Sequence, residues 1–132
     1  MNFKNEIDEI TKLAISELDK VKFNQRTKED RLKAVGNIYF LYSNGEMKYI
    51  GQRQAKGIKT RLDQHLFGKS FSVDKNNVQN GTISKWNKVN AEIEIGNKIT
   101  FKTILIEPDN LRTTIELELI NHFKPEWNIQ GK

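Results

Sequence analysis

Cysteine is absent from this chain of 132 residues, and histidine occurs only twice. The absence of cysteine excludes disulfide bonds and metal sites built from thiolates. Two histidines are too few for a zinc site unless carboxylates supply most of the ligands. Any metal ion would therefore be held mainly by oxygen atoms.

Long apolar runs are missing as well. No segment approaches the ~20 apolar residues that cross a lipid bilayer, and the opening MNFKNEIDEI lacks the apolar core of a secretion signal. Hydrophobic residues make up 36% of the chain and charged residues 30%, which is typical of a globular protein. We therefore expect a cytoplasmic protein without membrane contact, built around one hydrophobic core.

Positive charge is concentrated in the middle of the chain. Residues 21–88 contain fourteen lysine and arginine residues against five acidic residues, whereas residues 1–20 and 89–132 each carry a net charge of −2. Such a concentration is typical of a surface that binds a polyanion, most often nucleic acid. A surface that only keeps the protein soluble would have the same composition, so charge alone leaves both interpretations open.

Residues 1–33 are predicted to form an N-terminal helical extension. Apolar residues recur at helical spacing over residues 5–21, which indicates an amphipathic helix. Its apolar stripe would pack on the core of the same chain or on a second copy in a homo-oligomer. Residues 22–33 are mostly charged and fit a linker or a continued exposed helix, so we place the main domain at residues 34–132.

A β-hairpin is predicted where residues 38–42 and 47–50 flank the turn sequence Ser43-Asn44-Gly45. A two-residue turn would pair Phe40 with Tyr49 and send Tyr39 to the opposite face. A three-residue turn that includes Ser43, with Gly45 as a bulge, would pair Tyr39 with Tyr49 on one face. Only the second arrangement makes the phenols neighbours, and tyrosines on strands are commonly just packing residues.

Further helices and a strand are predicted after the hairpin. Ile58, Leu62 and Leu66 form a helical stripe, and Arg61 and His65 share a face beside it. Arg61 could bind a phosphate there through two hydrogen bonds. Alternatively, the aliphatic part of its side chain could pack at the edge of the core, with His65 as another packing residue. The remaining predictions are a loop at 68–81, a short helix at 84–89 and a central strand, covered on both faces, at 98–107.

A last helix is predicted over residues 111–123, before the stop signal Lys124-Pro125. At ~100° per residue, Glu116 falls inside the apolar arc of this helix, and Glu118 falls outside it. A lone carboxylate on a buried face is costly unless it meets a cation or takes up a proton. We therefore expect Glu116 to pair with an arginine such as Arg61 or to bind a metal ion.

Several of these residues follow one another in a characteristic order along residues 36–128. They are Ile38-Tyr39, Tyr49-Ile50-Gly51, Arg61, His65, Glu116 in E-x-x-L-I, and Asn128 in P-x-x-N. In this order and spacing the chain resembles the GIY-YIG nuclease superfamily. The glycine of the first motif stands one place early, at Gly36, and the segment from Gly51 to Arg61 is longer than in many relatives.

The resemblance implies hydrolysis of phosphodiester bonds in double-stranded DNA with one divalent metal ion, Mg²⁺, for which Mn²⁺ would substitute. Glu116 would hold the metal. The implied catalytic residues are Tyr39, Tyr49, Arg61, His65 and Glu116. The implied substrate-binding residues are Gly51, Arg53, Lys59, Lys85 and Asn128. The hairpin would then present both phenols to one scissile phosphate, which requires the three-residue turn. The family leaves open which tyrosine acts on the attacking water.

Together, the patterns and the resemblance predict an α+β fold with a small central antiparallel sheet of three strands flanked by helices. We expect an endonuclease that nicks or cuts DNA with low or short sequence specificity, since the chain leaves no room for a separate recognition domain. Two alternatives remain. A non-catalytic nucleic-acid-binding module would bind DNA without metal-dependent turnover, and a structural protein that docks through its N-terminal helix would not be retained on DNA.

Overall fold

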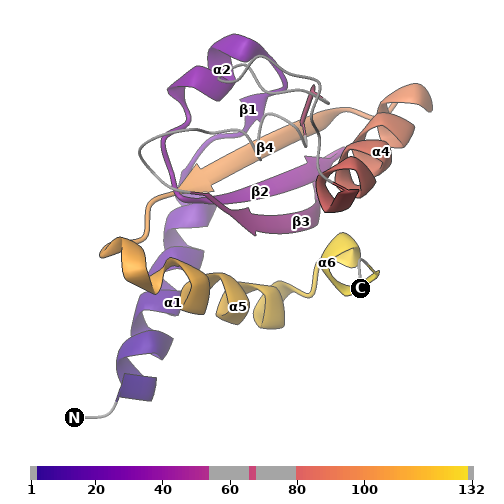
Figure 1. Cartoon of the computed structure of the whole chain (residues 1–132). Coiled ribbons are helices and arrows are strands. Elements are labelled where there is room, and N and C mark those ends of the chain that lie inside the picture. The colour runs from indigo at the N-terminus through magenta and orange to yellow at the C-terminus, as the bar shows by residue number, and fades with distance from the viewer. Residues whose placement is uncertain (1–2, 54–65, 68–79, 131–132) are drawn as a thin grey trace.

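The computed structural model describes residues 3–53, 66–67 and 80–130, and an antiparallel sheet of four strands lies at its centre (Figure 1). The strands are β1 (Asn24–Gln25), β2 (Ile38–Ser43), β3 (Glu46–Gln52) and β4 (Ile99–Ile104), in the spatial order β1-β4-β2-β3. The predicted α+β fold class is confirmed. The predicted count of three strands is wrong, because β1 pairs with β4 as a fourth strand. The sequence did not indicate this strand, since its two residues are both polar.

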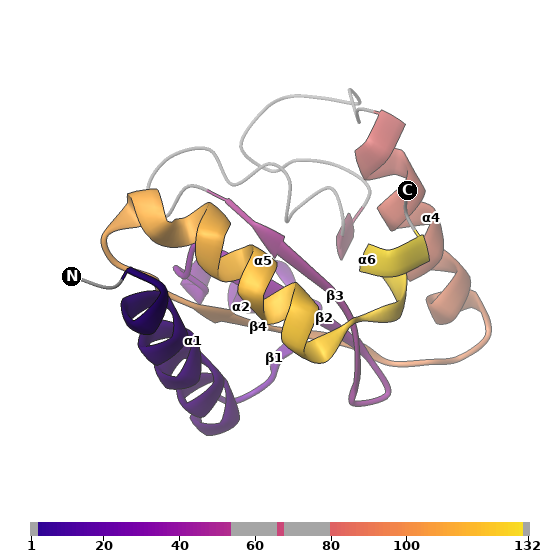
Figure 2. The same cartoon turned by 90° about the horizontal axis from the view of Figure 1, so that it is seen from below.

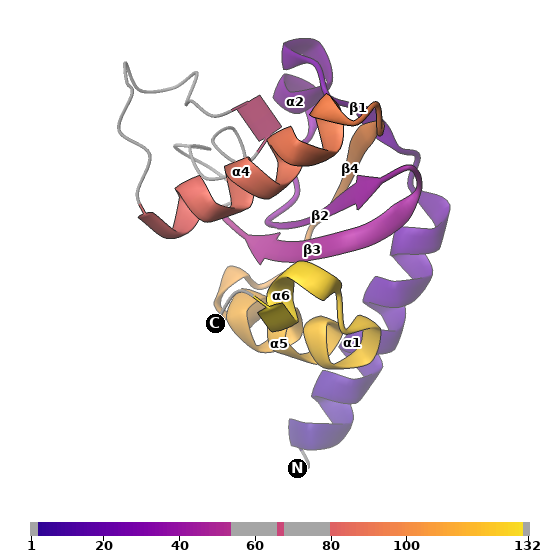
Figure 3. The same cartoon turned by 90° about the vertical axis from the view of Figure 1, so that its right-hand side faces the viewer.

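Helices cover both faces of the sheet. α1 (Phe3–Lys20) and α5 (Arg112–Phe123) lie side by side on one face, as Figure 2 shows. α4 (Asn80–Glu94) covers the other face, and α6 (Glu126–Gln130) lies beside β3 (Figure 3). The short helices α2 (Lys28–Lys33) and η1 (Asp109–Leu111) precede β2 and α5. Within these described ranges, no helix is both long enough and apolar enough to cross a membrane.

The predicted helices at both ends of the chain are confirmed. α5 ends where Lys124 adopts a left-handed conformation, with φ of 49°, directly before Pro125. The helix predicted at 84–89 is part of the longer α4. Residues 22–33 contain β1 and α2 instead of a plain linker, and Thr27 caps α2 by accepting a hydrogen bond of 3.1 Å from the backbone N–H of Asp30.

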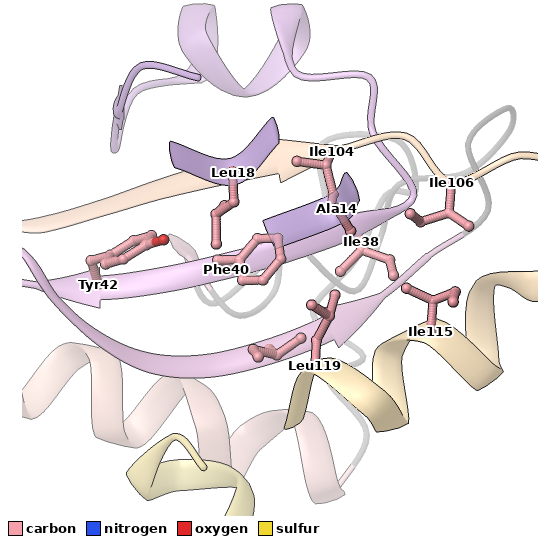
Figure 4. Close-up of a cluster of buried hydrophobic side chains, with 10 residues drawn as sticks. Ala14, Leu18, Ile38, Phe40, Tyr42, Ile104, Ile106, Ile115 and Leu119 are labelled. Carbon is pink, nitrogen blue, oxygen red and sulfur yellow. The ribbon is translucent and has the colours of Figure 1, made fainter. Parts of the chain in front are cut away.

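The side chains of β2 alternate between two hydrophobic clusters on opposite faces of the sheet. Phe40 belongs to the first cluster, where it is fully buried between α1 and α5 (Figure 4). The buried members are Ala14, Leu18, Ile38, Phe40, Tyr42, Ile50, Ile104, Ile106, Ile115 and Leu119. A hydrogen bond of 3.0 Å, which Lys102 of β4 donates to the carbonyl of Leu18, also joins α1 to the sheet. The apolar stripe of α1 therefore packs on the core of its own chain.

The second cluster lies under α4 and contains Tyr39. Its buried members are Ala34, Tyr39, Leu41, Leu66, Val89, Ile99, Phe101 and Trp127. Phe101 and Ile104 of β4 belong to different clusters, and β4 lies between β1 and β2. The prediction of a central strand covered on both faces is thus confirmed for β4.

Candidate active site on strand β3

The hairpin turn has two residues. Ser43 pairs with Glu46, and the two residues between them have positive φ, 49° at Asn44 and 83° at Gly45. Positive φ at both central positions defines a type I′ turn, for which Asn-Gly is the preferred sequence. The prediction of a three-residue turn is therefore wrong.

A bulge farther along β3 nevertheless brings the two phenols together. Tyr42 pairs with Met47 but Leu41 pairs with Tyr49, so Lys48 is an extra residue on β3. The extra residue shifts the alternation by one position and turns Tyr49 to the face of Tyr39. Their ring centroids lie 6.2 Å apart with an angle of 47° between the planes. The predicted proximity is confirmed, although the partner opposite Tyr39 is Gly51.

Gly51 makes room for the phenol of Tyr39. A Cβ atom at position 51 would lie 2.5 Å from the hydroxyl oxygen of Tyr39 and even closer to its ring. Tyr39 is 0% exposed, so its ring is tightly enclosed, whereas Tyr49 is half-buried. The resemblance implied that Gly51 binds the substrate; in the structure this glycine makes room for the ring of Tyr39.

Glu116 lies on the face of α5 that meets β3, where it is half-buried. Its Oε1 accepts a hydrogen bond of 2.9 Å from the side-chain amide of Gln52. The amide oxygen of Gln52 accepts two hydrogen bonds in turn, one of 2.7 Å from Nε of Arg112 and one of 3.0 Å from the hydroxyl of Thr113. Sequence reasoning missed Gln52, yet strand alternation after Gly51 turns its side chain to the face of α5.

Gly51 and Gln52 connect the two groups of candidate residues. They are consecutive on β3, the edge strand, so one meets Tyr39 on the face of α4 and the other binds Glu116 on the face of α5. The tyrosine pair and the glutamate thus lie on opposite faces at the same end of one strand. At this edge Tyr49 and Glu116 are half-buried, whereas Tyr39 is fully buried.

Arg53 does not fit its predicted part in substrate binding. It is buried, and its Nε donates a hydrogen bond of 2.9 Å to the carbonyl of Gly36. Its Nη2 donates to the carbonyl of Ala34. A guanidinium that is tied inside the protein to the segment before β2 stabilises that segment, and it is not presented to a phosphate on the surface.

Asn128 completes the outer edge of the sheet. Its Oδ1 accepts a hydrogen bond of 2.8 Å from the backbone N–H of Ile50, and its Nδ2 donates one of 2.9 Å to the carbonyl of the same residue. Both polar groups of the amide therefore hold α6 against β3. The resemblance implied a part in substrate binding for Asn128, whereas in the structure both polar groups of its amide already have protein partners.

The other predicted site residues lack a described side chain. Lys85 lies on α4, but only its backbone is described. Lys59, Arg61 and His65 lie outside the described residues, as does most of the predicted loop at 68–81. The predicted contact of Arg61 with Glu116 or with a phosphate therefore stays a prediction.

The fit of a metal ion to this site rests on Glu116. The described ranges contain no group of three or more histidine, cysteine, aspartate or glutamate residues that could hold a metal ion. A single carboxylate suits Mg²⁺, which keeps several of its water ligands and often binds through one or two carboxylates and a substrate phosphate. Glu116 fits this kind of site, because the amide of Gln52 orients its carboxylate without neutralising its charge.

Comparisons of the chain with known protein families, with curated proteins and with solved structures give no match.

Proposed function

We propose that this protein is a metal-dependent endonuclease that cuts double-stranded DNA. The observation that carries the proposal is the arrangement at Gly51 and Gln52. Tyr39 and Tyr49 meet beside Gly51, and Glu116 binds the next residue of the same strand. These are the residues through which the sequence resembles the GIY-YIG nucleases, and the hairpin and helix that carry them pack together at one edge of the sheet.

Glu116 would supply the ligand to Mg²⁺ or Mn²⁺. When bound, the ion would stabilise negative charge on the phosphate and lower the pKa of its bound water. Tyr39 or Tyr49 would position the attacking water or take up its proton, and a phenol needs cationic neighbours to act as a base at neutral pH. Arg61 would stabilise the developing charge, and His65 would orient a tyrosine or share its proton.

The charge of the chain supports nucleic acid as the substrate class that the resemblance implies. The excess of nine positive charges over residues 21–88 favours a polyanion. From the N-terminal extension and the ending KPEWNIQGK we infer, within the superfamily, a resemblance to the endonuclease II of T-even bacteriophages. We infer that the protein acts in the cytoplasm of a bacterial or phage-infected cell. One such site cuts one strand, so a double-strand break would need two copies or two visits.

Plasmid cleavage tests the proposal. Supercoiled plasmid should be nicked or linearised by the parent protein with Mg²⁺ and left intact when EDTA is added. Glu116→Gln should lower the cleavage rate by about 100-fold or more, because the stabilisation that a metal ion provides amounts to several kcal/mol. Glu118→Gln changes another half-buried glutamate of α5 in the same way and should cleave at the parent rate.

Binding measured on the same DNA separates the alternatives. Salt-dependent binding without cleavage in Mg²⁺ or Mn²⁺ would overturn the endonuclease and favour a non-catalytic binding module. If the protein does not bind DNA at moderate salt, the alternative of a structural protein that docks through its N-terminal helix would be favoured. Cleavage by Glu116→Gln at the parent rate would remove Glu116 from the site.

A further inference from the structure

Gln52 lies between Glu116 and two hydrogen-bond donors of α5. Its Nε2 is 2.9 Å from Oε1 of Glu116, and its Oε1 is 2.7 Å from Nε of Arg112 and 3.0 Å from the hydroxyl of Thr113. Arg112 and Glu116 are one helical turn apart on α5. The amide of Gln52 therefore fills the space between an arginine and a glutamate that would otherwise face each other.

The chemistry of the donors fixes which way this amide points. Nε of Arg112 can only donate a hydrogen bond, so it requires the oxygen of Gln52. The nitrogen of Gln52 is thereby directed at Glu116, whose carboxylate can only accept while it is ionised. A reversed amide would place two donors together at Arg112 and two acceptors together at Glu116.

Arg112 is itself anchored to the start of β2. Its Nη1 donates a hydrogen bond of 2.7 Å to Oδ2 of Asp109, and Oδ1 of Asp109 accepts one of 3.1 Å from the amide of Asn37. Asn37 is fully buried and exchanges two hydrogen bonds with the backbone of Ile106. The arginine that orients Gln52 is therefore linked, through the exposed carboxylate of Asp109, to a buried residue two positions before Tyr39.

We propose that Gln52 is a positioning residue for the Glu116 carboxylate, an inference that rests on the proposed function. The amide holds one carboxylate oxygen in place and, being neutral, does not compete with a divalent cation for the negative charge of Glu116. A lysine or arginine at this position would compete with the cation for that charge. Outer partners of metal-binding carboxylates typically change metal affinity or activity by about 10- to 100-fold when they are lost.

The test replaces the amide and measures metal binding directly. Mn²⁺ broadens NMR signals of nearby nuclei, so a titration that follows backbone amides of α5 gives a dissociation constant without any turnover. Gln52→Met keeps the length of the side chain and removes both hydrogen-bonding groups, so the dissociation constant should rise by about 10- to 100-fold. In plasmid cleavage the half-saturating Mg²⁺ concentration should rise equally, and the rate at saturating Mg²⁺ should stay near that of the parent.

Asn90→Leu supplies the matched control. Asn90 donates a hydrogen bond of 3.0 Å to Glu94 on the exposed side of α4, which is also an amide bound to a carboxylate. Its loss should change neither the Mn²⁺ titration nor cleavage. Thr113→Val removes one of the two donors that orient Gln52 and should raise the Mn²⁺ dissociation constant by a smaller factor, which keeps the inference testable if Gln52→Met does not fold.

The outcomes separate this inference from the proposed function. If Glu116→Gln abolishes the Mn²⁺ effect on α5 but Gln52→Met and Thr113→Val bind Mn²⁺ like the parent, the positioning role is wrong and the endonuclease stands. If Glu116→Gln leaves the Mn²⁺ titration unchanged, or if the parent shows no Mn²⁺ effect on α5, the metal site fails and the positioning role fails with it. A lower rate at saturating Mg²⁺ with unchanged metal affinity would also overturn the positioning role.

Discussion

Gly51 shows, at the scale of single residues, how closely this fold encloses a catalytic candidate. Alanine at position 51 would place its Cβ atom against the phenol of Tyr39, which is completely buried and cannot move aside freely. We expect Gly51→Ala to lower the free energy of unfolding by about 1–3 kcal/mol, as overpacking of a core does. Urea denaturation followed by circular dichroism measures this change.

The variant Tyr39→Leu tests the cause of that loss. Without the phenol, the added methyl group at position 51 has room, so Gly51→Ala should cost less in a Tyr39→Leu background than in the parent. The coupling between the two substitutions should reach about 1 kcal/mol, which is ordinary for residues in contact. An equal cost in both backgrounds would mean that Gly51 serves the strand backbone and not Tyr39.

Single residues also mark how far the sequence could predict the site. Tyr39 and Tyr49 could be expected on one face, but the bulge at Lys48 that places them there has no sequence signature. Gln52 could have been found, because alternation along β3 turns it toward α5. The burial of Arg53 could not have been predicted, because it depends on carbonyl groups of the segment before β2 that only the fold brings close to Arg53.

Among the secondary-structure elements, α4 and the hairpin turn are joined by a polar contact. Glu92 near the end of α4 accepts hydrogen bonds of 2.6 Å from Ser43 and 2.9 Å from Asn97. These two hydrogen bonds, chiefly that of Ser43, hold the pKa of Glu92 below its usual range, and the nearby charge of Lys48 acts in the same direction. Burial opposes them with a smaller effect.

This lowered pKa makes the contact sensitive to acid. Because folded Glu92 binds a proton less readily than unfolded Glu92, its contribution to stability is present above the ordinary pKa of 4.5 and is lost as pH falls through the lower pKa of the folded state. Glu92→Gln cannot titrate, so its free energy of unfolding should fall less steeply than that of the parent between about pH 5 and 3. Urea denaturation at several pH values measures both slopes.

A second glutamate on the same helix provides the comparison. Glu94 is exposed and contacts only the side chain of Asn90 among the interactions described for it, so Glu94→Gln should follow the acid dependence of the parent. If Glu92→Gln and Glu94→Gln have the same slope as the parent, Glu92 does not link the stability of α4 to pH.

At the scale of the whole molecule, the packing of the N-terminal helix α1 bears on whether residues 1–33 are an extension separate from the main domain. The sequence predicted an amphipathic helix but could not say what its apolar stripe would meet, because periodicity defines a face and not its partner. In the structure Ala14 and Leu18 are 4% and 3% exposed within the first cluster, and the two residues of β1 that follow the helix extend the sheet. α1 is therefore part of the hydrophobic core of the chain. The predicted boundary between an N-terminal extension and a main domain at residue 33 can be tested by experiment.

Removal of α1 tests this organisation. A chain that starts at residue 22 would expose Phe40 and Ile104 and lose the burial of several apolar side chains of α1, each worth about 1.5–3 kcal/mol. This loss is comparable with the total stability of a small domain, about 5–15 kcal/mol, so the shortened chain should not unfold cooperatively on heating.

In the full chain, Leu18→Ala should cost about 2–5 kcal/mol, whereas Leu13→Ala, at a position of α1 that is 66% exposed, should cost less than about 0.5 kcal/mol. A shortened chain that melts cooperatively near the temperature of the parent would show that α1 is a separable extension, and the main domain would then begin after it.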